Sequence, residues 1–334
     1  MTELTVEHLT KSHGAHPVLH GVDLAVPSGT IVALLGASGC GKTTMLRLIA
    51  GFEPADGGRI SLGGRLLEGP GVHVPAERRR IGYVPQEGTL FPHLTVADNV
   101  GFGLDRAERR QGKAADAIRL TGLEGLERRY PHQISGGQQQ RTALARALAP
   151  GPGLILLDEP FNALELGLRR SVSADVVALL RASGSTAILV THDPDEAFAS
   201  ADRVAVMRQG RIVQYAEPRA LYRRPVDAEV ARLTGETILL DGEAAGEGAS
   251  TVLGPVALAA AASGRCRVML RPEQVGLAAA GEGVAAEVLS TAFRGDHALV
   301  TVALGQTRLD LRLSALEEIG RQIRLKVSGP AVAF

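Results

Sequence analysis

Residues 36–43 of the chain are Gly36-Ala37-Ser38-Gly39-Cys40-Gly41-Lys42-Thr43. An apolar run, 31–35, precedes them, and a segment of helix-forming residues, 44–50, follows. This order predicts a strand, a glycine-rich turn and a helix, which is the context that a phosphate-binding loop requires. Glycines let successive backbone N–H groups converge on one anion, and the helix N-terminus adds further donors. We expect Lys42 to reach the β- and γ-phosphates of a nucleotide and the Thr43 hydroxyl to bind Mg²⁺.

The composition is that of a soluble globular protein. The chain has 334 residues, 45% of them hydrophobic and 22% charged, which is enough for a large core and for two domains. The formal net charge is zero and Trp is absent, so neither charge nor aromatic content favours a nucleic-acid partner. The two cysteines, Cys40 and Cys266, lack metal-site spacing and indicate a reduced, cytosolic setting. The apolar run 256–262 is too short to span a bilayer.

Two regions between residues 54 and 150 are relevant to the predicted phosphate-binding site. A hairpin is expected at 59–67 and a strand at 81–85, which ends at Gln86. The carboxamide of Gln86 could bind Mg²⁺ or contact an attacking water. Residues 87 to about 150 are expected to be mainly helical, with helices at 107–120 and 136–149.

The second of these helices begins with another potential anion site. Ser135, Gly136, Gly137 and Gln138 combine small residues with a helix N-terminus, the same physical arrangement as the first loop. One nucleotide needs only one phosphate-binding loop, so the second site requires an explanation.

Polar residues follow two apolar runs that are typical of buried parallel strands. Asp158 and Glu159 come after 154–157, and Thr191 and His192 come after 187–190. The carboxyl ends of such strands bind ligands in open α/β sheets. Asp158 suits a Mg²⁺ site, and Glu159 could polarise a water aimed at the γ-phosphate. The alternatives are a helix cap for the acidic pair and a structural role for His192.

The composition changes near Gly235. Short apolar runs separated by glycine follow, at 237–240, 267–270, 284–289, 299–303, 308–313 and 323–327. Regular short strands of this kind predict a small β-barrel. Residues 241–250 are expected to form a flexible loop.

Taken together, these motifs resemble the ATP-binding subunits of ABC transporters. Residues 36–43 look like the Walker A loop of that family, Gln86 its Q-loop, 134–138 its signature, 154–159 its Walker B segment and His192 its switch histidine. The resemblance implies an α/β P-loop NTPase domain, 1–234, with a mixed sheet core and a helical subdomain at about 87–150. A small all-β, oligomer-binding-fold-like (TOBE) domain, 235–334, would follow. Its role is either regulation by a ligand or stabilisation of a dimer.

The resemblance also implies the ligands and their contacts. Glu159 would activate water, and His192 would sense or stabilise the γ-phosphate of ATP. Mg²⁺ would be bound by Thr43, Gln86 and Asp158. The residues expected to contact the nucleotide are His13, Val18, Gly36, Ala37, Ser38, Gly39, Cys40, Gly41, Lys42, Thr43, Thr44, Gln86, Ser135, Gly136, Gly137 and Gln138.

The implied partners explain the second anion site. Two copies would stack head to tail, so that each phosphate loop faces residues 135–138 of the other copy. Two transmembrane permease subunits and, indirectly, a solute-binding protein would complete an importer, with this chain peripheral on the cytoplasmic face of the membrane. The segments 50–53 and 86–96 resemble most the ferric-iron importer ATPases. A sugar or polyamine importer remains the alternative, and a DNA-repair or chromosome-organising ABC ATPase would need a long heptad insertion that the sequence lacks.

Two positions depart from the family pattern. His13 stands where an aromatic residue usually stacks on adenine, and Glu165 stands where an aspartate usually follows the Walker B segment. Imidazole offers less stacking area than tyrosine or phenylalanine, so we expect weaker nucleotide binding. The longer side chain of Glu165 is expected to alter the coupling between two sites.

Overall fold

The computed structural model describes residues 3–86, 90–162, 166–279, 281–314 and 319–334. It divides into two compact units, Met1–Leu221 and Tyr222–Phe334. The change of composition near Gly235 therefore falls inside the second unit. Among the described residues, no helix has both the length and the apolar character needed to cross a membrane.

The centre of the first unit is a six-stranded sheet in the order β11-β10-β3-β9-β8-β7. Neighbouring strands are parallel, except for the antiparallel pair β10 and β11. Every residue of β3, β8 and β9 is buried, as expected for continuous apolar runs covered on both faces. The strands are β3 (Ile31–Leu35), β7 (Ile81–Val84), β8 (Leu154–Asp158), β9 (Thr186–Thr191), β10 (Arg203–Arg208) and β11 (Arg211–Ala216).

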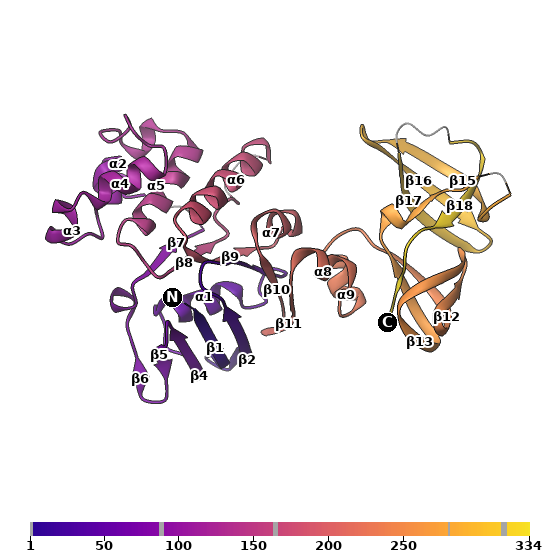
Figure 1. Cartoon of the computed structure of the whole chain (residues 1–334), viewed down its shortest axis with the longest axis horizontal. Helices are drawn as coiled ribbons and strands as arrows, with labels where there is room; N and C mark the ends of the chain where they lie inside the picture. The colour runs from indigo at the N-terminus through magenta and orange to yellow at the C-terminus, as the bar shows by residue number, and fades with distance from the viewer. Residues whose placement is uncertain (1–2, 87–89, 163–165, 280, 315–318) are drawn as a thin grey trace. The chain divides into compact units, whose positions relative to one another are not determined.

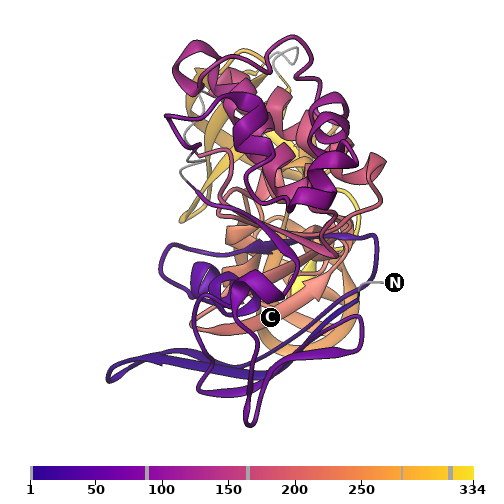
Figure 2. The same ribbon diagram turned by 90° about the vertical axis from the view of Figure 1, so that its left-hand side faces the viewer.

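A second sheet, antiparallel and in the order β2-β1-β4-β5-β6, packs on the other side of helix α1 (Lys42–Ala50). Met45, Leu46, Leu48 and Ile49 of this helix share one core with both sheets, which fixes the axis of the helix that follows the phosphate loop. The hairpin of β1 and β2 is the indigo ribbon that extends to one side in Figure 2. The strands are β1 (Leu4–His13), β2 (His16–Val26), β4 (Gly57–Leu62), β5 (Arg65–Gly69) and β6 (Val72–His73).

The helical part of the first unit has a core of its own and lies beside β7 (Figure 1). Its helices are α2 (Val96–Val100), α3 (Arg106–Arg110), α4 (Lys113–Leu120) and α5 (Gly136–Leu148). The prediction of one helix over 107–120 was wrong. The chain turns at Gln111 and Gly112, where Gly112 has a φ of 78°, in the left-handed region that ends helices. Helices α6 (Leu166–Ala182) and α7 (Pro194–Ser200) complete this unit.

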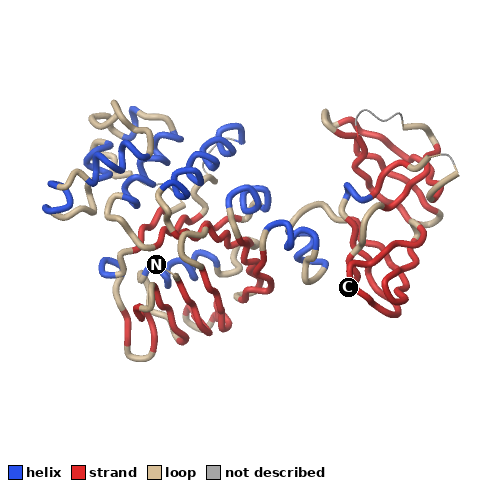
Figure 3. Tube along the Cα trace, viewed as in Figure 1, coloured by secondary structure: helices blue, strands red, loops and turns tan. Residues whose placement is uncertain are grey.

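Strands make up most of the second unit (Figure 3). Its two antiparallel sheets have the orders β12-β13-β19 and β14-β18-β15-β16-β17, and residues of both form one core. The edge strands β14 and β17 touch each other, so the larger sheet curls as the barrel prediction requires. The elements are α8 (Pro218–Arg223), which spans the division between the units, α9 (Ala228–Leu233), β12 (Ile238–Thr251), β13 (Gly254–Leu270), β14 (Val275–Leu277), β15 (Val284–Phe293), β16 (His297–Leu304), β17 (Thr307–Ser314), β18 (Gln322–Val327) and β19 (Val332–Ala333).

The expected flexible loop at 241–250 is instead most of β12. It pairs with β13 from Asp241↔Arg267 to Ser250↔Pro255. Ala244 and Ala249 are buried in the core of this unit. Alanine and glycine at such positions gave too weak a hydrophobic alternation for the strand to be recognised from sequence.

Candidate nucleotide-binding site

The loop between β3 and α1 has a backbone that only glycine suits at two positions. Gly39 and Gly41 have φ values of 79° and 106°. A Cβ atom on Gly36 would lie 2.3 Å from the Met207 carbonyl oxygen, and one on Gly41 would lie 2.9 Å from Leu19 Cδ2. The loop is therefore pressed against neighbouring strands in a fixed shape, and its N–H groups are arranged in advance for an anion.

Lys42 places a buried positive charge at the loop. Its side chain is 4% exposed, and Nζ lies 4.0 Å from Glu159 Oε1. Nζ also donates hydrogen bonds to the carbonyl oxygens of Gly36 (2.7 Å) and Ala37 (3.0 Å). A buried ammonium held mainly by carbonyl oxygens is suited to exchanging them for phosphate oxygens, which carry negative charge.

A second group of oxygen atoms lies at the end of β8. Asp158 is 3% exposed; its Oδ1 accepts a hydrogen bond from Thr43 Oγ1 (3.1 Å), and its Oδ2 accepts one from the Tyr83 hydroxyl (3.0 Å). Burial raises the pKa of Asp158, while these two hydrogen bonds lower it. Burial and the Asp158 charge raise the pKa of Tyr83, which keeps the phenol protonated. A carboxylate beside a hydroxyl is the hard-oxygen donor set that Mg²⁺ prefers.

Glu159 follows with an unusual backbone. Its φ of 43° is rare for a residue with a side chain and carries strain, which often marks functional sites. The Glu159 N–H donates to the Val190 carbonyl oxygen (3.1 Å). Its Oε2 lies 3.4 Å from His192 Nδ1 and accepts a hydrogen bond from Asn162 Nδ2. The side chains of Glu159 and His192 are 15% and 45% exposed, so both can be reached from solvent.

For the other predicted nucleotide and metal contacts, the structure gives the position of the residue in the fold. Gln86 is exposed two residues after the end of β7, and the parallel pairing of β7 with β8 puts it at the edge where Asp158 lies. Val18 lies against the loop, since its carbonyl oxygen would be 3.3 Å from a Cβ on Gly41. His13 is exposed at the end of β1 and pairs with His16 across the turn. Glu165 lies outside the described residues.

The second predicted anion site forms the beginning of α5. Ser135 Oγ accepts from the Gln138 N–H (3.3 Å), and Gln138 Oε1 accepts from the Ser135 N–H (2.9 Å). This capping box satisfies two helix-end donors reciprocally. Ser135 and Gly136 are exposed, while Gly137 is buried. A Cβ atom on Gly137 would lie 3.2 Å from Val172 Cγ2, so a side chain there would displace Val172. The start of α5 thus presents an exposed, firmly shaped helix N-terminus.

Three further residues contact the predicted site or its supports and were not predicted from the sequence: Tyr83, Asn162 and Glu196. Glu196 of α7 accepts a hydrogen bond from Thr191 Oγ1 (2.7 Å), one residue before His192. Burial raises the pKa of Glu196 to about 7, and the charges of Asp193 and Glu159 add to this effect. Within the described residues, Glu196 Oε1 and Arg169 Nε are buried without hydrogen-bond partners. Only the spacing of Asn162 after Glu159 could have suggested such contacts.

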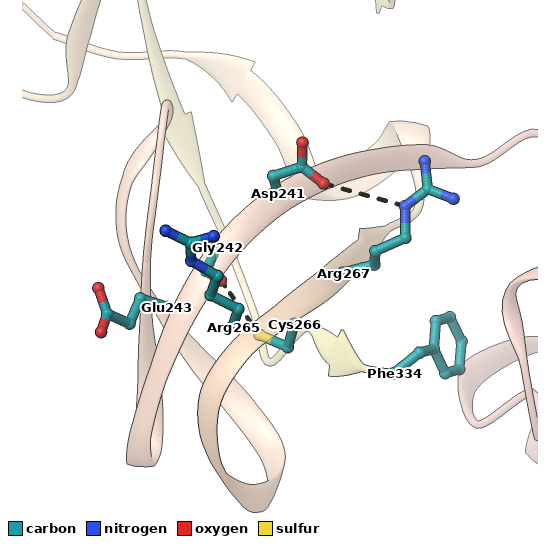
Figure 4. A pocket seen from close by; sticks show the side chains of 7 residues that line it. All are labelled: Asp241, Gly242, Glu243, Arg265, Cys266, Arg267 and Phe334. Carbon is teal, nitrogen blue, oxygen red and sulfur yellow. Dashed lines mark hydrogen bonds and ion pairs between the residues drawn. The ribbon is translucent and has the colours of Figure 1, made fainter.

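The second unit contains a shallow hollow of about 670 Å³ beside β12, β13 and the chain end (Figure 4). Its charged lining is open to solvent, because the side chains of Asp241 and Arg267, 4.0 Å apart, are 98% and 57% exposed. It therefore lacks the buried polar groups that distinguish the loop site. Its lining residues are Asp241, Gly242, Glu243, Arg265, Cys266, Arg267 and Phe334.

Both units match known protein families. The ABC transporter family model matches residues 19–162, and the TOBE domain model matches 268–328. A protein of Rhodococcus jostii named Fe(3+) ions import ATP-binding protein FbpC 1 is 45% identical over 99% of this chain and 98% of its own length. A Mesorhizobium japonicum protein named Fe(3+) ions import ATP-binding protein FbpC is 45% identical over 100% of both.

A solved structure, described as a dimeric post-hydrolysis state of the ATP-binding cassette MJ0796 bound to ADP and Pi, matches with a TM-score of 0.55 and 30% identity. It covers 64% of this chain and 98% of its own. The predicted fold class is confirmed. On the full-length similarity and the two family matches, the chain belongs to the ABC transporter family and is an ABC ATPase with a C-terminal TOBE domain.

Proposed function

We propose that this ABC ATPase drives the import of ferric iron through membrane permease subunits. The observation that carries the proposal is the identity of about 45% with ferric-iron import ATPases, which extends through both units and not only through the nucleotide-binding motifs. The chain would hydrolyse ATP at the cytoplasmic face of the membrane, and a solute-binding protein would deliver the iron to the permease.

Within the proposed site, the geometry supports the following roles. The N–H groups of residues 37–43 and the Lys42 ammonium would bind the phosphates of ATP. Thr43, Asp158 and Gln86 would hold Mg²⁺, which neutralises charge on the β- and γ-phosphates when bound. Val18 and His13 would contact the adenosine part.

Glu159 is the proposed general base. Its carboxylate would accept a proton from the attacking water, whose oxygen forms the new bond to the γ-phosphorus as the bond to the ADP oxygen breaks. Asn162 and His192 both contact Oε2 of Glu159 and would hold the carboxylate in place. His192 is exposed enough to contact the γ-phosphate as well.

We further propose that the active form is a head-to-tail homodimer. The exposed N-terminus of α5 is a ready anion site, and it would complete the nucleotide site of the other copy with Ser135, Gly136, Gly137 and Gln138. The solved structure of the related cassette MJ0796 is described as dimeric with ADP and Pi bound, which supports this arrangement. The TOBE unit would stabilise the dimer; regulation by a ligand in that unit is the alternative.

Uptake of labelled ferric iron tests the proposal. Cells that lack their own ferric-iron importer would carry this chain with its permease and binding protein, or the same system with Glu159→Gln. Uptake with the wild-type chain and none with the variant would support both the cargo and the base. Equal iron uptake by the two would contradict the role of Glu159, and uptake of labelled maltose or polyamine instead of iron would contradict the ferric assignment.

A further inference from the structure

We propose that Tyr83 is a positioning residue for the metal site, whose hydroxyl fixes the orientation of the Asp158 carboxylate. This inference rests on the proposed Mg²⁺ site. The two oxygens of Asp158 have different donors: Thr43 Oγ1 on Oδ1 at 3.1 Å and the Tyr83 hydroxyl on Oδ2 at 3.0 Å. With both oxygens held, the carboxylate cannot rotate without losing a hydrogen bond in a nearly inaccessible position.

The fold delivers the Tyr83 hydroxyl to this point. Strands β7 and β8 run parallel with Tyr83 beside Leu156, and Asp158 lies two residues farther along β8. A long aromatic side chain is needed to cover that separation. A phenol is protonated at neutral pH and can donate a hydrogen bond to the carboxylate.

The ring of Tyr83 is itself held in place. It packs against the buried core between the two sheets, and the Phe52 ring meets it edge-on, with centroids 5.1 Å apart and planes at 90°. The hydroxyl therefore has little freedom to move away from Asp158. Partners that orient a metal ligand in this way commonly change metal affinity by tenfold or more when they are removed.

The change Tyr83→Phe isolates the hydroxyl, because it keeps the ring and its contact with Phe52. We expect the binding of Mn²⁺, used as a spin probe of the Mg²⁺ site, to weaken by about tenfold. The affinity for ADP in EDTA should stay unchanged, because the phosphate loop and Lys42 are untouched. In the ATPase assay, the apparent KM for Mg²⁺ should rise by a similar factor while kcat at saturating Mg²⁺ stays nearly constant.

Mn²⁺ binding would be measured by electron paramagnetic resonance on the full-length chain, with ADP present and protein in excess over ADP. The matched control is Tyr215→Phe, which removes a tyrosine hydroxyl that donates to the Ala25 carbonyl oxygen at 2.9 Å in the same unit. Thermal midpoints of both variants without ligand would report any loss of stability.

The outcomes separate this inference from the proposed function. Weaker Mn²⁺ binding in Tyr83→Phe alone, with metal-free ADP binding preserved, would support it. Wild-type Mn²⁺ affinity in Tyr83→Phe, or equal losses in the two variants, would overturn the positioning role and leave the metal site standing. Failure of the wild-type chain to bind Mn²⁺ with ADP would overturn the proposed metal site itself, and the role of Tyr83 with it.

Discussion

Among single residues, Glu159 contacts both Lys42, which we propose binds phosphate, and His192, which we propose contacts the γ-phosphate. Its Oε1 faces Lys42 at 4.0 Å, and its Oε2 contacts Asn162 and His192. The positive φ of this residue costs backbone energy that the surrounding contacts must offset. A carboxylate held by a cation, an amide and an imidazole can accept a proton without changing position.

Replacing Glu159 with Gln should separate nucleotide binding from turnover. The amide keeps the shape and one acceptor oxygen but cannot act as a base, so we expect ATP to bind while hydrolysis falls by about 10²-fold or more. The variant should accumulate as an ATP-bound dimer, measured by light scattering after size-exclusion chromatography. The control is Glu7→Gln on the exposed side of β1, and a monomeric, fully active Glu159→Gln protein would contradict the assignment.

Replacing His13, at the end of β1, tests the proposed contact with adenine. His13→Tyr should tighten ATP binding by about two- to tenfold, because a phenol ring offers more stacking area than imidazole, a gain of about 0.5–1.5 kcal/mol. Titration with a fluorescent ATP analogue measures the affinity. His16, the exposed residue paired with His13 across the turn, provides the control His16→Tyr, and equal affinity in all three proteins would refute the contact.

Among the helices, strands and turns, the sequence predicts those elements whose own residues carry a recognisable pattern. The apolar runs of β3, β8 and β9 and the glycine-rich turn before α1 were recognisable because each carries its own signal. Tyr83 could not be assigned to Asp158 from the sequence, because their contact depends on the pairing of β7 with β8. The paired residues Tyr83 and Leu156 are 73 positions apart in the chain. The strand at 241–250 was missed because its pairing partner, and not its own composition, makes it a strand.

Helix α7 carries a pH-dependent contribution to stability. The pKa of Glu196 is raised from 4.5 to about 7 in the folded chain, so the folded state holds its proton more tightly than the unfolded state. The stabilising effect is complete below pH 4.5 and is lost as the pH rises through 7, with a total of about 3 kcal/mol. Glu196→Gln removes the titration and keeps an acceptor for Thr191.

We therefore expect Glu196→Gln to unfold near the wild-type midpoint at pH 5 and at a higher urea concentration than wild type at pH 8. Urea unfolding followed by circular dichroism at several pH values measures the difference. Ala199→Gln, which adds an amide on the exposed side of α7 without removing a carboxyl, is the control. A difference between Glu196→Gln and wild type that stays constant with pH would rule out the titration.

At the scale of the whole molecule, Arg271 explains where the second unit begins. The residue is 3% exposed, and its guanidinium donates to the carbonyl oxygens of Tyr222 (2.8 Å) and Ala231 (2.9 Å) and to Thr234 Oγ1 (3.0 Å). Its Cζ also lies 4.0 Å from the centroid of the Tyr222 ring. These bonds attach α9 and the flanking segments to the β-sheet unit, although the composition of residues 222–234 resembles that of the preceding helices.

Replacing Arg271 with Met should therefore loosen the second unit and leave the first intact. The carbonyl oxygens of Tyr222 and Ala231 and the hydroxyl of Thr234 would lose the hydrogen bonds that the guanidinium donates, at a cost of about 3 kcal/mol or more in total. We expect limited proteolysis of the full chain to cut within residues 222–237 faster than in wild type, while ATP affinity remains unchanged. Arg267→Met is the control, because that side chain is 57% exposed and lies 4.0 Å from Asp241. If both variants resist proteolysis equally, Arg271 does not hold the segment; if Arg271→Met also loses ATP binding, the two units do not act as separate stability units.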